Sequence, residues 1–500
     1  MNILFINLPP ASTKKSGNKL YWLQSSMNLG LLAVASAASR AGHAVSVYDW
    51  LGNHQVRLLE LLPDILSKAP PDIVGLSLPS GYGEEYCGPL SKLLKQHMPQ
   101  VRIVVGGQYH AGMRARSLLE RFPLLDAVAV GDGEPLDWAQ LATCDLSAPP
   151  PGIVTHQSSE QQGLSPAPAS KKIAPEYRFD LLQLDVRTYA PSIEVGRGCP
   201  FTCSFCSLSG APASLEPASQ DTITAQLKFW VDTWSELERV PIYFECPVFF
   251  CNKGNIAEYE ECLSPFAHRI EWRTQCRVDS VDPIVLPRLH QLGLRILDVG
   301  LESASPRMLE LMKKTTGRAE LYLQRAQALL DAAAACGVGI KLNILLFPGE
   351  TEQTAKETAD FIWRNRSKIS GIAASAAIEF PGSDLSTQLG AFQLLYGTRR
   401  RVDESVSPAG IFPLDLSHEF SLERAREWCL QMTRDVTTAE SYFRLKRIGY
   451  FRPDLSFAQF LEVVRSSDPT SLPFAMPDAM RAGPAHGPGA WDIVQWDQLR

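Results

Sequence analysis

The sequence predicts an α/β protein with two consecutive domains and a mostly helical C-terminal region, 391–500. Two long stretches, 1–145 and 189–390, each alternate short apolar segments with helical ones, the pattern of strands covered by helices. A stretch rich in Pro, Ser and Gln, 146–188, separates them and predicts a linker. At 500 residues the chain is also too long for a single hydrophobic core.

The first stretch predicts a doubly wound, Rossmann-like domain. Its apolar segments are nearly continuous in hydrophobic residues, as expected for parallel strands that are covered on both faces. The predicted strands are residues 2–8, 44–50, 72–78, 102–108 and 127–133. Ligands of such sheets bind beyond the carboxyl ends of the strands, so the turns after these strands are the candidate binding loops.

The second stretch predicts an incomplete, TIM-like (β/α)6 barrel. Six strand–helix units fit into it, and strands that are joined by helices run parallel. The predicted strands are residues 192–197, 241–246, 270–276, 295–301, 339–347 and 372–380. In barrels of this kind the chemistry takes place at the carboxyl ends of the strands.

Composition and charge exclude several classes of protein. The net charge is −6 and there is no basic field, which predicts no nucleic-acid partner. No apolar run approaches about 20 residues, which predicts no membrane span. The first residues, "MNILFINLPP", lack the signals of a secretory leader, so we expect a cytoplasmic protein. Its 11 cysteines would then be free thiols and metal ligands.

Three of these cysteines, Cys199, Cys203 and Cys206, fall within eight residues in the segment "GRGCPFTCSFCSLSG". A structural zinc site needs a fourth ligand, usually from a second paired motif. The other cysteines of this stretch form no such pair: Cys246, Cys251, Cys262 and Cys276. Three soft thiolates instead favour a [4Fe–4S] cluster whose fourth iron is open to another ligand. Zinc is the less favoured alternative.

This cysteine pattern, which follows the first predicted barrel strand, resembles that of the radical S-adenosylmethionine (SAM) enzymes. In that family the open iron binds SAM. Reduction of the cluster by an external donor, such as a flavodoxin or ferredoxin, then cleaves SAM to methionine and a 5′-deoxyadenosyl radical. Further stretches resemble the SAM-binding strand ends of the family, and the contacts that they imply are Glu245, Arg277, Glu302 and Leu345.

The resemblance gives each of these residues a role, with two departures from the family pattern. Arg277 faces the methionine carboxylate, Glu302 binds the ribose or amino group, and Leu345 belongs to the segment beside the adenine. Where the family usually has an acidic pair, this sequence has Glu245 followed by a cysteine, and Leu346 replaces a glycine. The alternative is that the charged residues merely cap strands of an ordinary barrel.

The first domain carries no nucleotide signature, since no G-x-G-x-x-G follows its first strand and no P-loop is present. A Rossmann-like domain before a radical SAM barrel resembles the cobalamin-binding class of that family, over roughly residues 1–390. The resemblance implies cobalamin, held by turns whose backbone N–H groups glycine leaves accessible. The glycines of these turns are Gly106, Gly107, Gly131 and Gly133. The alternative is a degenerate domain that only supports the barrel.

The ligand below the cobalt is a separate question. None of the nine histidines fits the D-x-H-x-x-G motif of domains in which histidine binds cobalt. His110 follows the fourth strand, and a structural role is favoured for it over cobalt ligation. The resemblance implies that the lower face of cobalt meets the loop after the third strand, where the candidates are Leu78, Pro79, Ser80 and Tyr82.

The resemblance implies a cobalamin-dependent radical SAM C-methyltransferase. Co(I) would take the methyl group of one SAM to form methylcobalamin. The radical from a second SAM would abstract hydrogen from the carbon that then receives the methyl group. This class often acts on amino-acid- or peptide-derived natural products, so we expect a small biosynthetic intermediate as substrate, and the sequence assigns no catalytic residue. The alternatives are an oxidative cyclase or ring-rearranging enzyme without methyl transfer, and a non-enzymatic iron–sulfur and corrin sensor or carrier.

Overall fold

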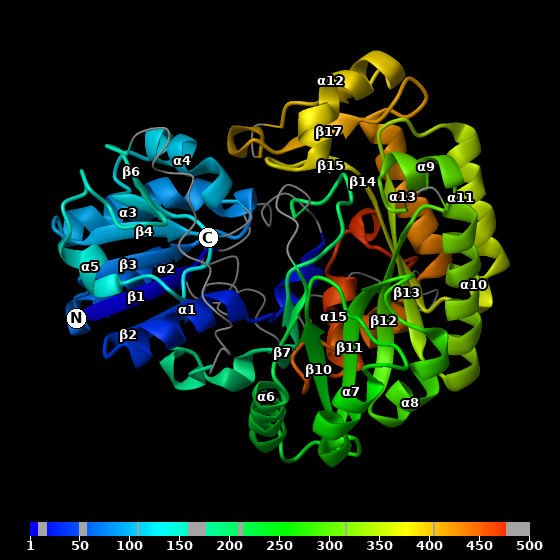
Figure 1. Cartoon of the computed structure of the whole chain (residues 1–500), viewed down its shortest axis with the longest axis horizontal. Coiled ribbons are helices and arrows are strands. Elements are labelled where there is room, and N and C mark those ends of the chain that lie inside the picture. Colours follow the sequence, from blue (N-terminus) through cyan, green and yellow to red (C-terminus); the bar gives the residue numbers. More distant parts are fainter. Residues whose placement is uncertain are drawn as a thin grey trace. The chain divides into compact units, whose positions relative to one another are not determined.

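The computed structural model describes residues 1–8, 18–49, 58–107, 110–158, 177–208, 214–315, 318–403 and 406–476. The chain divides into two compact units (Figure 1). Unit 1 contains Met1–Ser16 and Gln24–Tyr189, and unit 2 contains Gly17–Leu23 and Ala190–Pro484. No helix among the described residues is both long enough and apolar enough to cross a lipid bilayer.

Unit 1 is built on a six-stranded sheet with the order β2-β1-β3-β4-β5-β6. The strands are β1 (Asn2–Asn7), β2 (Ala44–Asp49), β3 (Ile73–Ser77), β4 (Arg102–Gly106), β5 (Ala127–Ala129) and β6 (Ile153–Thr155). The first five are parallel, and β6 is antiparallel to β5. The helices are α1 (Leu29–Arg40), α2 (Leu58–Lys68), α3 (Cys87–His97), α4 (Ala115–Arg121) and α5 (Trp138–Thr143). The predicted doubly wound sheet is confirmed, and its strand order reverses between β1 and β3, where such folds bind ligands.

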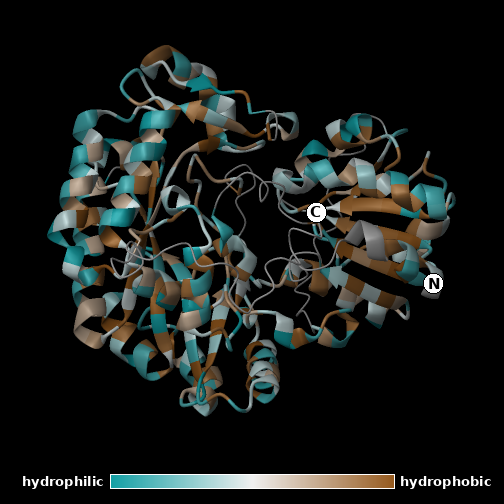
Figure 2. Ribbon diagram, turned by 180° about the vertical axis from the view of Figure 1, so that it is seen from behind, coloured by the Kyte–Doolittle hydropathy of each residue, from teal (hydrophilic) through white to brown (hydrophobic). Residues whose placement is uncertain are grey.

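The strands of unit 1 are apolar on both faces because both faces are covered. Phe5 and Ile6, in the centre of β1, are 2% and 0% exposed, and hydrophobic residues fill most of this sheet (Figure 2). Strand β6 lies within the stretch expected to be a linker. Its three residues are buried against β5, and residues 159–176 of the same stretch lie outside the described residues.

Unit 2 contains a parallel sheet with the order β14-β13-β12-β11-β10-β7. The strands are β7 (Ser192–Glu194), β10 (Val240–Glu245), β11 (Ile270–Arg277), β12 (Leu294–Glu302), β13 (Gly339–Leu346) and β14 (Gly371–Ala376). The connecting helices are α6 (Gln220–Thr233), α7 (Ile256–Leu263), α8 (Leu286–Gln291), α9 (Pro306–Leu311), α10 (Ala319–Cys336) and α11 (Glu352–Arg364). The six predicted strands of the partial barrel are confirmed, and β7 and β14 stand at the two ends of the sheet order.

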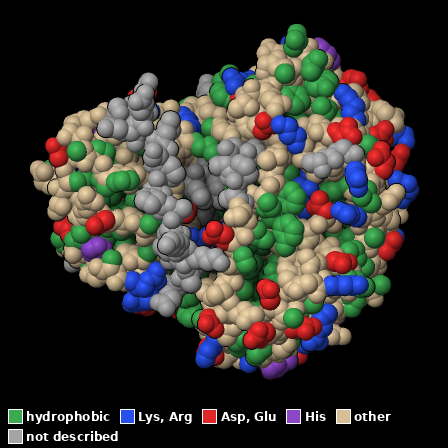
Figure 3. All heavy atoms as spheres, viewed as in Figure 1, with side chains coloured by type: hydrophobic (Ala, Val, Ile, Leu, Met, Phe, Trp, Pro, Cys, Tyr) green, Lys and Arg blue, Asp and Glu red, His purple; other side chains and the backbone are tan. Residues whose placement is uncertain are grey.

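The remainder of unit 2 is mostly helical, as predicted. Its helices are α12 (Asp384–Tyr396), α13 (Leu422–Val436), α14 (Ala439–Arg447) and α15 (Phe457–Arg465). A small antiparallel sheet, β15 (Ile378–Glu379), β17 (Phe412–Asp415) and β16 (Arg399–Arg400), interrupts them. Helix α13 packs along strand β14. On the face drawn in Figure 3, acidic and basic side chains of this unit are interspersed.

Candidate functional site

The three-cysteine loop lies at the carboxyl end of the first barrel strand, as the barrel rule predicts. It follows β7 and the short β8 (Gly196–Arg197). The Ser204 N–H donates to the carbonyl of Met312 at 2.9 Å, and the Ser204 carbonyl accepts from Leu385 at 2.8 Å. These bonds anchor the loop to two other segments of the unit. The central cysteine, Cys203, is buried, whereas Cys199 and Cys206 are half-buried.

Arg277, at the end of β11, places its positive charge against this loop. Its Nη1 donates to Cys203 Sγ at 3.2 Å, and its guanidinium lies 3.7 Å from the centre of the Phe201 ring. Asp279 fixes the guanidinium with two hydrogen bonds of 2.8 and 3.0 Å. Burial by itself lowers the pKa of Arg277, but the bonds to Asp279, together with the charges of Tyr322, Asp279 and Cys203, more than offset burial and raise that pKa above its usual value. The cation is therefore permanent.

Glu302, at the end of β12, forms a buried ion pair that sequence reasoning missed. Its carboxylate lies 3.0 Å from Lys314 Nζ, and both side chains are largely buried. Its backbone is left-handed, with φ of +67°, beside a register shift between β12 and β13. A Cβ on Gly300 would lie 2.7 Å from the Glu302 carboxylate, so glycine makes room for this pair. Burial lowers the pKa of Lys314, but the charges of Glu302, Tyr322 and Cys203 together more than offset burial and raise that pKa.

The sequence does not identify Lys314 as a site residue, because the adjacent Lys313 is the same residue type and neither belongs to a recognisable motif. Only the fold separates them: the Lys314 side chain is 5% exposed, whereas that of Lys313 is 47% exposed. The Lys314 ammonium also lies 5.8 Å from the centre of the Phe205 ring in the cysteine loop. The structure therefore brings Arg277 and Glu302, both predicted, together with an unpredicted cation around the loop.

The other two predicted SAM contacts end the neighbouring strands. Glu245 closes β10 and pairs in register with Glu194 of β7. Burial, reinforced by the charge of Glu194, raises the pKa of Glu245 to about 7. Cys246, which stands where the family's second acid is expected, is buried against Thr274. Leu345, near the end of β13, is half-buried in the same apolar cluster as Phe205 of the cysteine loop.

In unit 1 the turns after β3 and β4 are held together by their backbones. Leu78 N–H donates to the Gly106 carbonyl at 2.7 Å. A Cβ on Gly107, whose φ is +150°, would lie 2.0 Å from the Leu78 carbonyl oxygen, so only glycine fits there. Beyond Leu78, Pro79 is exposed and Ser80 is half-buried. The strand ends therefore present backbone and small, uncharged side chains.

The remaining predicted residues of unit 1 flank these turns. Tyr82 is half-buried in the short helix that follows β3. Gly131 has a φ of +89°, in the left-handed region that favours glycine. A Cβ on Gly133 would lie 2.8 Å from the Val34 side chain, so this glycine allows the turn after β5 to approach α1.

His110 is buried in an ion-pair cluster, in line with the structural role favoured by the sequence. Its Nε2 lies 2.6 Å from Glu84 Oε1, and Glu84 also accepts from Arg114 at 3.0 Å and Arg121 at 2.5 Å. Glu84 is 1% exposed. The cluster joins the helical segment after β3 to the segments after β4, and so supports both turns.

Two family models match the chain, one in each unit. The B12 binding domain matches residues 24–137, and the radical SAM superfamily matches residues 193–362. The chain therefore combines a B12 binding domain with a radical SAM domain, the domain pairing of cobalamin-dependent radical SAM methyltransferases. Its cofactors are a [4Fe–4S] cluster, SAM and cobalamin.

Several curated relatives match the chain at low identity. An uncharacterized methyltransferase of Pyrococcus horikoshii is 26% identical over 76% of this chain and 82% of its own length. The hopanoid C-3 methylase of Methylococcus capsulatus is 26% identical over 64% of this chain and 61% of its own. The anaerobic magnesium-protoporphyrin IX monomethyl ester cyclase of Cereibacter sphaeroides is 25% identical over 61% of this chain and 51% of its own length. The chain thus spans about half to four fifths of the length of these relatives.

A solved structure has the same fold. The radical SAM methyltransferase TsrM of Kitasatospora setae, with tryptophan and a SAM analogue bound, superposes with a TM-score of 0.65 at 16% identity. The match covers 81% of this chain and 79% of that one.

The residues around the loop fit the cluster of this family. Thiolates are the ligands that iron–sulfur clusters use, and Arg277 supplies a hydrogen bond to one sulfur, as is common around such clusters. Among the residues that the structure describes, no three Cys, His, Asp or Glu side chains converge on a single point. A cluster does not require this, because each cysteine binds a different iron.

The strand ends of unit 1 fit cobalamin in a different way. Residues 78–83, which follow β3, carry no charged side chain, and the described histidine after β4, His110, is hydrogen-bonded to Glu84. Sequence reasoning missed a polar network at the same point. Asn28, which caps α1, donates to Asn7 at 2.7 Å and to Ser77 at 3.0 Å. Polar residues that end apolar strands are the signal that could have revealed it.

Proposed function

We propose that this chain transfers a methyl group from SAM to a carbon of a small amino-acid- or peptide-derived biosynthetic intermediate. The observation that carries the proposal is the three-cysteine loop at the strand ends of a partial barrel, in a chain that also has a B12 binding domain. When bound, the cluster supplies the electron that cleaves one SAM to methionine and a 5′-deoxyadenosyl radical, and cobalamin carries the methyl group of another SAM to the substrate carbon. A cytoplasmic flavodoxin or ferredoxin would supply the electron.

The residues of unit 2 then have distinct tasks. The cluster ligands are Cys199, Cys203 and Cys206. Arg277, fixed by Asp279, orients the methionine carboxylate and donates to one ligand sulfur. Glu302 and Glu245 bind the ribose and amino groups of SAM, and Leu345 offers apolar surface to the adenine. Lys314 holds the Glu302 carboxylate in place.

In unit 1 the backbone of the turns performs the binding. Turns containing Gly106, Gly107, Gly131 and Gly133 approach the corrin and its nucleotide tail through N–H groups. Residues 78–82 would lie on the lower face of the bound cobalamin. They include no histidine, cysteine or methionine, and the imidazole of His110, after β4, is hydrogen-bonded to Glu84. Neither segment would therefore offer cobalt a strong ligand, which would favour the reduced state that methyl transfer from SAM requires.

The rival function is oxidative cyclisation or ring rearrangement with the same two cofactors. A cyclase is among the relatives, but this chain spans only 51% of its length, whereas it spans 82% of the uncharacterized methyltransferase. The comparison supports methyl transfer as the first hypothesis.

The test uses the full chain, reconstituted anaerobically with cluster and cobalamin. Methyl-labelled SAM, a reductant and a panel of amino acids and short peptides are added, and the products are analysed by mass spectrometry. We expect label in an acceptor together with S-adenosylhomocysteine and 5′-deoxyadenosine. Label that never reaches an acceptor would contradict the proposal, and 5′-deoxyadenosine without S-adenosylhomocysteine would favour the rival.

A further inference from the structure

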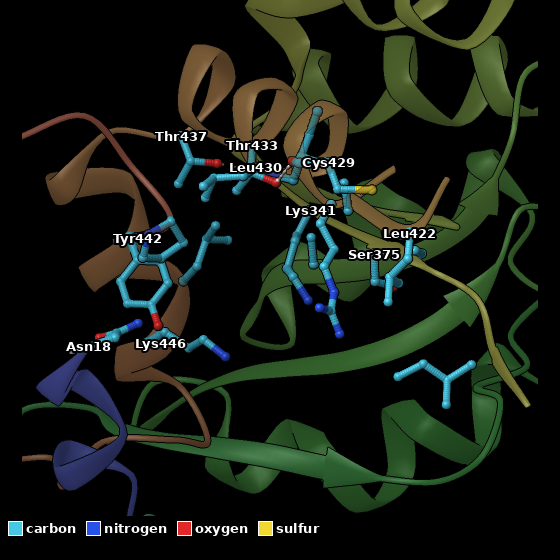
Figure 4. Close-up of a pocket in the computed structure, with 18 residues that line it drawn as sticks. Asn18, Lys341, Ser375, Leu422, Cys429, Leu430, Thr433, Thr437, Tyr442 and Lys446 are labelled. Carbon is cyan, nitrogen blue, oxygen red and sulfur yellow. Dashed lines mark hydrogen bonds between the residues drawn. The ribbon is translucent and has the colours of Figure 1, made fainter. Parts of the chain in front are cut away.

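Unit 2 contains a pocket of about 520 Å³ where β13 and β14 meet helices α13 and α14 (Figure 4). This volume is in the range of small-molecule sites. Its lining includes Lys341 near the start of β13, Ser375 near the end of β14, and Ile378 just beyond. None of the cysteine-loop or SAM residues described above lines it. The pocket therefore adds a second site to the barrel unit.

The pocket is open because strand β14 has small side chains. Four consecutive lining residues, 373–376, are Ala-Ala-Ser-Ala, and Ala373 and Ser375 are exposed. These two pair in register with Asn343 and Leu345 of β13, so they lie on the same face as the predicted adenine contact. Apolar side chains such as Leu422 and Leu430 of α13 form the facing wall. Most of the lining can thus hold an apolar body.

One end of the pocket is strongly positive. Lys341 and Lys446 both line it, from β13 and α14, and Figure 4 shows the two side chains reaching toward the same space. Lys341 Nζ lies 3.0 Å from Asn343 Oδ1 and 3.9 Å from Asp298 Oδ1. Asp298 is already bound by fully buried Arg273 through two hydrogen bonds of 3.0 and 2.8 Å. Asp298 thus faces two cations, Arg273 and Lys341.

Lys446 has no carboxylate partner among the residues that the structure describes. Its ammonium lies 3.7 Å from the centre of the Tyr450 ring and 5.9 Å from that of Tyr442. Burial, followed by the positive charges of Lys341 and Arg273, lowers the pKa of Lys446 to about 7, while Asp298 opposes the shift. Lys446 is half-buried. A cation withdrawn from water without a counter-ion is costly, and an anion in the pocket would offset that cost.

We propose that this pocket binds the carboxylate or phosphate group of a substrate whose remaining body is largely apolar, with the oxyanion between Lys341 and Lys446. This inference rests on the proposed function and narrows its substrate. The lining runs from Ile372 to Ala376 along β14, toward the strand ends where the cysteine loop lies. At about 3.3 Å per residue, the lining residues of β14 extend roughly 13 Å along the strand.

The first measurement is calorimetric titration of the full chain, loaded with cluster and cobalamin, with three probes of equal chain length: octanoate, octyl phosphate and 1-octanol. We expect at least one anion to bind about tenfold more tightly than the alcohol, and the tighter anion identifies the headgroup. Equal affinity for all three probes would overturn the proposal.

The second measurement repeats the titration with variants. Lys446→Met and Lys341→Met should each lower the affinity for the preferred anion about tenfold and change the affinity for the alcohol less than twofold. Ser375→Leu, which fills the open part of the pocket, should weaken all three probes. Lys356→Met, on the exposed side of α11, is the matched control and should bind like the wild type. Unchanged anion affinity in both pocket-lysine variants would also overturn the proposal.

A separate assay of SAM cleavage in the absence of substrate tests the proposed function independently of the pocket assignment. If the wild type cleaves SAM but shows no anion preference, only the pocket assignment fails. If the wild type does not cleave SAM, the proposed function fails, while the titrations still decide whether the pocket binds anions. Should Lys446→Met be unfolded by circular dichroism, Lys341→Met and Ser375→Leu decide the outcome.

Discussion

The two parallel sheets of this chain carry different kinds of site at their carboxyl ends. In unit 2 the strand ends present charged side chains, with Arg277 against Cys203 and Glu302 against Lys314. In unit 1 the ends of β3 and β4 present backbone and glycine, and Glu84, His110, Arg114 and Arg121 beyond these ends pair with one another. SAM is a small, charged ligand, whereas a corrin is large and mostly uncharged. We infer that a small, charged ligand requires charged side chains at its site, whereas a large, mostly uncharged ligand is bound mainly by the shape of the backbone.

The change with the largest expected effect removes one ligand of the cluster. Cys203→Ala should abolish cluster binding, because the two remaining thiolates cannot hold three irons. Formation of 5′-deoxyadenosine should fall to background, as measured by chromatography alongside iron content. Cys336→Ala, at a half-buried cysteine that ends α10, is the control and should keep full iron. Normal iron content in Cys203→Ala would refute the assignment.

A second test removes one charge from the rim of unit 2. Lys314→Met leaves the Glu302 carboxylate buried without a partner, and should lower the free energy of unfolding by about 3 kcal/mol. Lys313→Met removes only a surface ion pair with Asp384 and should cost less than about 1 kcal/mol. Urea denaturation measures both. Equal effects of the two changes would show that the ion pair at Glu302 is not buried in the way described.

A third test uses pH. The raised pKa of Glu245 means that the folded state holds a proton that the unfolded state releases between about pH 4.5 and 7. The free energy of unfolding should therefore fall as pH rises through that window, by about 2 kcal/mol. Glu245→Gln should remove this part of the slope. Urea midpoints at pH 5 and 7.5 measure it, and identical slopes in the two proteins would contradict the buried position of Glu245.

The smallest effect is expected for changes in unit 1, which alter the shape of the backbone turn after β4 and leave the charges unchanged. In Gly107→Ala the new Cβ would collide with the Leu78 carbonyl, so the turns must separate, and cobalamin affinity should fall about tenfold. In Gly106→Ala the new Cβ would lie 3.7 Å from Ala129, an ordinary contact, and affinity should change less than twofold. Absorbance titration with cobalamin measures both. If Gly106→Ala were the more damaging change, backbone approach at Gly107 would not be what shapes the site.

The same contrast explains what could be predicted from the sequence. The cysteine loop and the six barrel strands were predictable because ligand spacing and apolar alternation are local patterns. Lys314 was not predictable, since only tertiary burial distinguishes it from Lys313. Strand β6 was missed because three residues are too short for a periodic signal. The pocket beside β14 combines residues from distant segments, and no sequence pattern connects them.

If unit 2 cleaves SAM and unit 1 makes methyl transfer possible, cobalamin should affect only one of the two reactions. This is measured by comparing the full chain loaded with the cluster alone and with the cluster plus cobalamin, under reducing conditions with methyl-labelled SAM. We expect 5′-deoxyadenosine from both preparations, but S-adenosylhomocysteine only when cobalamin is present. S-adenosylhomocysteine that forms equally without cobalamin, or never forms with it, would refute this division of roles.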